Sequence, residues 1–200
     1  MKTKILILSM LFSGAMMTAQ ETFKKFNFGV RSGLNIATVV SEDDDFDNPD
    51  ARFGAYAGLV FEYRFSERFS LLTEAFYSQQ GFSLGDDVSL DDDFDAEFQV
   101  DYIQVPVLFK VNIIKGLSAH AGPQIGFKIN EEVDLDITEN GGDTETDFFN
   151  STDFQLATGA QYTFDFGLFV QARYTLGLSE VIEDSEGHNS IFSTGVGFMF

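Results

Sequence analysis

Apolar and polar residues alternate along most of the chain after residue 25. From Phe26 the sequence reads FNFGVRSGLNIA, so that Phe26, Phe28 and Val30 fall on one face of an extended strand and Asn27 and Arg31 on the other. A period of two is typical of a strand with one apolar face. The alternation returns in FGAYAGLVFEYRF, FSLLTEAFYSQQG, YIQVPVLFKV, LSAHAGPQIGFKIN, FQLATGAQYTF, FGLFVQARYTLGL and IFSTGVGFMF. The pattern therefore predicts eight strands of 10 to 13 residues.

The connections between these strands alternate in length. Short turns around Ser66, Lys115 and Asp165 follow the second, fourth and sixth strands, whereas the other strands are followed by long polar segments. The long segments are residues 38–52, 82–101, 130–153 and 179–190, and they hold 27 of the 32 acidic residues. Short turns at one end and long loops at the other favour an all-β fold, an eight-stranded up-and-down antiparallel transmembrane β-barrel with four long acidic extracellular loops.

The first residues predict export from the cytoplasm. Lys2 and Lys4 precede an apolar run from Ile5 to Phe12, and the small residue Ala19 stands before Gln20. We interpret residues 1–19 as a signal peptide and residues 20–200 as one outer-membrane barrel domain. The remaining chain has no cysteine and a formal net charge of −22, which disfavours nucleic acid as a partner.

The stretch DDDFD occurs twice in the long acidic segments, at Asp43–Asp47 and at Asp91–Asp95. Its alternating carboxylates are Asp43, Asp45, Asp47, Asp91, Asp93 and Asp95. Neither copy has the glycine and the glutamate of an EF-hand loop, so we interpret both as solvated charge on the rim. A weak calcium site, with an affinity no tighter than roughly 10⁻⁴ to 10⁻³ M, is the alternative. We expect no other metal and no cofactor.

Charged side chains also occupy the polar face of the strands. They are Arg31, Glu62, Arg64, Glu74, Lys110, Lys128 and Arg173. An eight-stranded barrel is only wide enough for side chains to fill its interior. We therefore expect these charges to pair inside the barrel, to fix the strand register and to plug the lumen, because buried charges must be paired.

Several segments resemble the PorT-type outer-membrane β-barrel family, relatives in shape of OmpX and OmpA. They are FGVRSGLNIA, LLTEAFYSQQG, YIQVPVLFKV and the last strand, which ends in Phe. The most specific matches are Glu74, Tyr77, Ser78 and Gly81, and Tyr102, Ile103 and Pro106. The resemblance implies an eight-stranded barrel in outer-membrane lipid, inserted by the barrel-assembly machinery, which reads the terminal aromatic residue Phe200. It implies no reaction, and one branch of the family takes part in protein secretion.

Three classes of function remain open. A monomeric, non-enzymatic surface protein would use its acidic rim to meet cations, a polysaccharide or a basic partner. A secreted barrel of the lipocalin type would instead turn its apolar face inward. A lipid-modifying enzyme would need a catalytic group at the outer edge of the membrane, and His188, near Ser185, Glu186 and Ser190, is the candidate. The other histidine, His120, is expected to point into the barrel.

Overall fold

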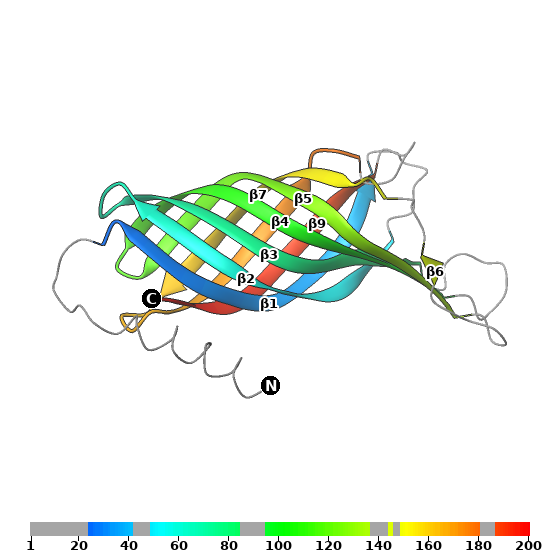
Figure 1. The fold of residues 1–200 in the computed structure, drawn as a ribbon, viewed down its shortest axis with the longest axis horizontal. Coiled ribbons are helices and arrows are strands. Elements are labelled where there is room, and N and C mark those ends of the chain that lie inside the picture. The colour runs from blue at the N-terminus through cyan, green and yellow to red at the C-terminus, as the bar shows by residue number, and fades with distance from the viewer. Residues whose placement is uncertain (1–23, 42–48, 85–94, 137–143, 146–148, 181–186) are drawn as a thin grey trace, which may run out of the picture.

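The computed structural model describes residues 24–41, 49–84, 95–136, 144–145, 149–180 and 187–200, which form a closed antiparallel barrel (Figure 1). The strands are β1 (Phe26–Ser41), β2 (Asp50–Arg64), β3 (Phe69–Leu84), β4 (Asp95–Ile114), β5 (Leu117–Asp136), β6 (Thr144–Glu145), β7 (Thr152–Thr163), β8 (Leu168–Gly177) and β9 (Gly187–Met199). Among the described residues, the two-residue β6 pairs with β5 alone, and the other eight strands make the wall. The eight-stranded barrel is thus confirmed, while the proposed signal peptide lies outside the described residues.

Each long strand pairs with its neighbours in sequence, and pairing of β1 with β9 closes the ring. The short turns after β2, β4 and β7 lie at one end of the barrel, together with the start of β1 and the end of β9 (Figure 1). We call this the turn end, and we call the opposite end the loop end. In the described part of the chain, no helix is long and apolar enough to cross a membrane.

Several strands are longer than the sequence pattern predicted. β4 and β5 have 20 residues each, and they remain paired as far as Asp95 opposite Asp136. The segments 38–52, 82–101 and 130–153 are therefore partly strand, and Asp95 of the second DDDFD copy belongs to β4. Backbone hydrogen bonds extend the sheet beyond the region in which outward side chains must be apolar, so the alternation ends before the strand does.

The two faces of the wall differ as the alternation predicted. The side chains of Phe26 and Phe53 are 75% and 71% exposed on the outside, whereas Arg31 and Glu74 inside the barrel are 3% and 2% exposed. Charge inside and aromatic residues outside are the arrangement of a barrel surrounded by lipid. The lipocalin-type alternative, with its apolar face inward, is therefore wrong.

Glycines on the inner face make room for the largest inward side chains. A Cβ atom built on Gly195 would lie 2.3 Å from the Tyr56 hydroxyl oxygen and 2.2 Å from the Ser32 carbonyl oxygen. Gly33, the partner of Gly195 in the β1–β9 register, has the same hydroxyl 2.6 Å from its would-be Cβ. These two glycines form a recess in the wall that accepts the Tyr56 hydroxyl group.

Candidate functional site

An ion-pair cluster crosses the middle of the lumen. Both Arg173 guanidinium nitrogens Nη1 and Nη2 donate to the Glu74 carboxylate, at 2.8 and 2.7 Å, and Arg31 Nη1 donates to the same carboxylate. The three side chains are each 1% exposed. β3 and β8, which carry Glu74 and Arg173, are four strands apart in the ring of eight, so this bidentate bridge spans the barrel from wall to wall.

Aromatic and polar groups enclose the Arg31 guanidinium. Its Cζ lies 4.4 Å from the centre of the Tyr56 ring and 4.6 Å from that of Phe76, distances at which the ring faces attract a cation. With its amide oxygen turned toward Arg31, Gln171 accepts two bonds from the guanidinium at 3.0 Å. The positive charge that Glu74 does not balance is thus stabilised on Arg31 by the faces of two rings and by an amide oxygen.

His120 joins the same cluster on the side of Arg173. The Arg173 Nε donates to His120 Nε2 at 3.3 Å, and His120 is 2% exposed. Because Nε2 accepts this bond, the ring is the neutral tautomer that carries its proton on Nδ1. His120 thus points inward, as the sequence pattern predicted, and packs against the ion pairs.

A second cluster lies nearer the turn end, around Glu62. Its Oε1 accepts from Ser70 Oγ at 2.7 Å and lies 3.2 Å from Lys110 Nζ. Arg64 Nε lies 3.7 Å from the same oxygen, but the Arg64 side chain is 38% exposed while that of Lys110 is 5% exposed. One buried cation and one half-solvated cation therefore share this carboxylate.

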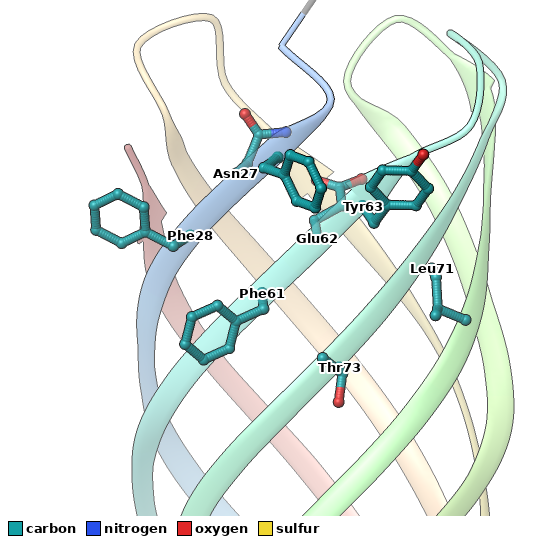
Figure 2. Close-up of a pocket in the computed structure, with 8 residues that line it drawn as sticks. Asn27, Phe28, Phe61, Glu62, Tyr63, Leu71 and Thr73 are labelled. Carbon is teal, nitrogen blue, oxygen red and sulfur yellow. The ribbon is translucent and has the colours of Figure 1, made fainter.

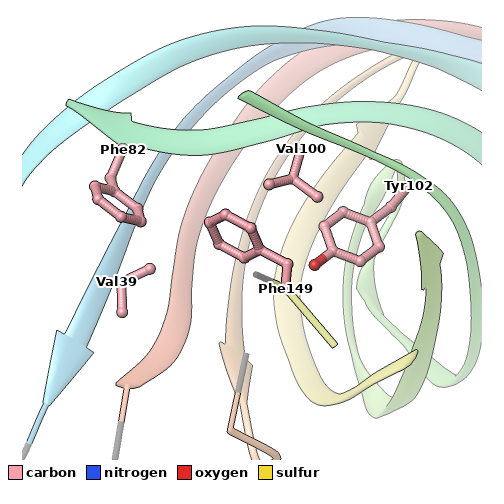
Figure 3. Close-up of a cluster of buried hydrophobic side chains, with 5 residues drawn as sticks. All are labelled: Val39, Phe82, Val100, Tyr102 and Phe149. Carbon is pink, nitrogen blue, oxygen red and sulfur yellow. The ribbon is translucent and has the colours of Figure 1, made fainter. Parts of the chain in front are cut away.

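A third cluster stands at the loop end. Lys128 Nζ donates to Glu131 Oε2 at 2.8 Å and to the Phe149 carbonyl oxygen at 2.5 Å, and the Phe149 N–H donates to Glu131 at 3.3 Å. These bonds hold the Phe149 ring inside the mouth of the barrel, where it packs against Phe82 with the ring centres 6.1 Å apart. Figure 3 shows the resulting apolar cluster of Val39, Phe82, Val100, Tyr102 and Phe149.

The seven predicted lumen charges therefore gather in three places rather than in one network. Arg31, Glu62, Glu74, Lys110 and Arg173 are buried, the Lys128 side chain is 11% exposed, and Arg64 sits at the rim of the turn end. Between the charged clusters lies a second apolar group, which consists of Val60, Leu72, Leu108, Ala157 and Phe169. Sequence reasoning missed both apolar groups, although the alternation places Val60, Leu72, Leu108 and Phe169 of the second group on the inner face.

Amide side chains occupy the layer between the central ion pairs and the apolar mouth. Gln124 Nε2 donates to Gln104 at 3.1 Å and to Gln155 at 2.6 Å. Asp153 accepts from Gln155 and from Asn189, both at 2.6 Å. All five side chains are buried, and their hydrogen bonds link the neighbouring strands β4, β5 and β7 and reach β9.

The DDDFD acids are not brought into a described site. Residues 42–48 and 85–94 lie outside the described residues, and for Asp95 only the backbone is described, at the start of β4. Among the described residues, no three His, Asp or Glu side chains gather as metal ligands would. The weak calcium site stays a prediction.

His188 lies in β9 rather than in the fourth loop. Its Nδ1 is 3.0 Å from the Ser179 carbonyl oxygen, and Ser190 Oγ is 3.0 Å from the Tyr174 hydroxyl. Ser185 and Glu186 lie outside the described residues. The hydrogen bond of His188 Nδ1 is thus made to the backbone at the base of the loop.

The turn end has two further contacts, one between Phe28 and Phe200 and one between Lys115 and Asp165. The Phe200 N–H donates to the Phe28 carbonyl oxygen at 2.8 Å, and the two rings stack with their centres 5.1 Å apart. Asp165 lies 2.9 Å from Lys115 Nζ, and this hydrogen bond raises the pKa of the Lys115 ammonium group. Both charged side chains are exposed, so the pair contributes little to stability.

The aromatic outer surface, the charged interior and the closed sheet define an integral β-barrel protein of the outer membrane. The model of the family described as "Outer membrane protein beta-barrel domain" matches residues 18–183, and the chain belongs to this family. None of the curated proteins compared with the chain matches it.

Solved structures share the fold at low sequence identity. The attachment invasion locus protein Ail of Yersinia pestis is 15% identical, with a TM-score of 0.53, and the alignment covers 88% of this chain and 99% of Ail. Neisserial surface protein A is 14% identical, with a TM-score of 0.56, and the alignment covers 86% of this chain and 97% of that protein. Likeness at this identity shows the fold alone.

Proposed function

We propose that this outer-membrane barrel has a plugged lumen and acts at the cell surface through its acidic loop rim, as a non-enzymatic protein that binds basic or cation-bridged partners. The observation that carries the proposal is the bidentate bridge between Glu74 and Arg173. It joins opposite walls at the middle of the barrel, with the amide layer and the Phe149 cluster above it. A solute would have to break buried ion pairs to pass, which favours a surface role over a diffusion pore.

The charge of the chain supports the choice of partner. Residues 38–52, 82–101, 130–153 and 179–190 at the loop end hold 27 of the 32 acidic residues, of which Asp101, Glu131 and Asp153 are buried. Short turns face the periplasm in barrels of this kind. A surface with this excess of carboxylates attracts positive groups from solution and repels polyanions. The partner class is therefore a basic protein segment, or a polysaccharide bridged by divalent cations.

Binding of a polycation to the purified protein in lipid nanodiscs tests this proposal. We expect poly-lysine to bind, and its affinity to fall steeply as salt rises from about 50 to 200 mM because the contacts are electrostatic. Changing Asp91, Asp93 and Asp95 to Asn should weaken binding several-fold. The matched control changes Glu67 and Asp165, exposed acids of the turn end, to their amides, and should leave the affinity unchanged.

Equal affinity of both variants, or binding that does not respond to salt, would contradict the rim as the binding surface. The PorT-type resemblance adds a finer alternative, a role in protein secretion, which would appear as loss of exported proteins after deletion of the gene. Enzymatic modification of lipid would appear instead as a change in lipid mass that depends on His188.

A further inference from the structure

We propose that the turn end carries a binding site for one anionic glycerophospholipid, with the phosphate held by basic residues at the start of β1 and the end of β2 and an acyl chain lying in an apolar hollow below them. The charge of the turn end is opposite to that of the loop rim. The basic side chains described there are Lys24, Lys25, Arg64, Arg68 and Lys115, against Glu67 and Asp165. Asp165 is already paired with Lys115.

Two of these cations, Lys24 and Lys25, are exposed, and Arg64, which is half-buried and 3.7 Å from Glu62, lies beside Lys25. The Arg64 N–H donates to the Lys25 carbonyl oxygen at 2.7 Å, which places the two residues side by side where β1 meets β2. Lys24 and Lys25 are exposed, and in the part of the chain that the structure describes neither forms an ion pair with a carboxylate. Their positive charge is therefore available to an anion outside the protein.

An apolar hollow opens on the outer face directly beside this group. It is lined by Phe26, Phe28, Phe61, Tyr63, Leu71 and Thr73, together with parts of Asn27 and Glu62. In Figure 2 the rings of Phe28 and Phe61 project from the wall on one side and Leu71 lies on the other, with the shorter Thr73 between them. A small residue flanked by large ones forms a recess, and its walls are hydrocarbon.

The register joins the hollow to the cations. Phe26, which is 75% exposed, is opposite Tyr63, so the upper edge of the hollow is one residue from both Lys25 and Arg64. A phosphate bound by these side chains would lie at the membrane surface, and the attached acyl chain would point down the strands into the recess. Aromatic side chains at this level are typical of the boundary between headgroups and hydrocarbon.

The occupant follows from the location and the charge. Short turns of outer-membrane barrels face the periplasm, so the lipid at this end is glycerophospholipid rather than surface glycolipid. A neutral or zwitterionic headgroup gains little from three cations, whereas an anionic headgroup such as phosphatidylglycerol gains attraction from each one. The site therefore takes an anionic phospholipid as a bound neighbour.

The chain contains no tryptophan, which makes a local lipid probe simple to install. The full-length Phe61→Trp variant is reconstituted in bilayers, and quenching of its fluorescence by phosphatidylglycerol brominated on the acyl chains is compared with quenching by brominated phosphatidylcholine. We expect relative binding to favour phosphatidylglycerol several-fold, up to on the order of tenfold, given the attraction of each basic group near the surface. The matched control, Tyr162→Trp, reports from the outer face of β7 near the same end of the barrel and should show a ratio near one.

Removing the charges distinguishes a built site from general attraction. Adding Lys24→Gln, Lys25→Gln and Arg64→Gln to Phe61→Trp should return the ratio to the control value without loss of the folded barrel, because these side chains lie at the rim. An equal ratio at the two tryptophan positions, or a ratio that survives the three substitutions, would overturn the proposal. So would preferential quenching at this position by brominated lipid A.

Discussion

Replacing Glu74 with alanine should destabilise the barrel by about 3–5 kcal/mol, the cost of leaving a buried charge without its partner. Two guanidinium groups, those of Arg31 and Arg173, donate to this one carboxylate, and all three side chains are 1% exposed. Without the carboxylate, two positive charges would face each other in a narrow lumen. Urea unfolding of the protein in lipid vesicles measures the free energy of unfolding directly.

The chain offers a matched control at Glu67, a glutamate exposed in the turn after β2. Glu67→Ala makes the same chemical change in water and should alter the free energy of unfolding by less than about 0.5 kcal/mol. Glu74→Gln, which keeps the size and loses the charge, should resemble Glu74→Ala. If Glu74→Ala were no more destabilising than Glu67→Ala, the central ion pairs would contribute nothing to the fold.

Removing each of the two cations of the Glu62 cluster should lower the free energy of unfolding by very different amounts. Lys110→Met keeps the length of the side chain but leaves the buried carboxylate without its nearest cation, 3.2 Å away, and should cost about 3 kcal/mol. Arg64→Ala removes a cation that is 38% exposed and 3.7 Å away, and should cost less than about 1 kcal/mol.

The same urea titrations give both values. The comparison isolates burial, because both cations face the same oxygen of Glu62. Equal losses for the two variants would show that exposure does not decide the strength of these pairs. A larger loss for Arg64→Ala would contradict the cluster as described.

Much of the wall could be predicted from alternation alone, because lipid outside and a narrow lumen inside impose opposite chemistry on successive residues. Phe26 and Arg31 are on the expected faces, as are Tyr56 and Glu74. The limits of β4 and β5 could not be predicted in the same way. Beyond the lipid, backbone pairing continues through acidic residues such as Asp95, where the side chains have no apolar environment to match.

The sequence pattern also could not predict which inward residues contact one another. Alternation places Lys110 and Lys128 inside, but it does not show that one pairs with Glu62 near the turn end and the other with Glu131 at the loop end. The carboxylate with which each lysine pairs depends on how far neighbouring strands are shifted along one another, because this shift sets the level of each side chain in the lumen. Phe149 gave no signal at all, because it lies in a segment between strands and is held in the mouth by a hydrogen bond from Lys128 and by one that its own N–H donates to Glu131.

Single-protein conductance in a planar bilayer tests the plugged lumen most directly. With the Glu74–Arg173 bridge across its middle and the Phe149 cluster in its mouth, the purified barrel should show no large steady pore at moderate voltage and high salt. The absence of current must be accompanied by proof of insertion, for which protease protection of the reconstituted barrel suffices. Reproducible, long-lived conductance steps of porin size from inserted protein would contradict the plugged lumen and, with it, the proposed role of the loop rim.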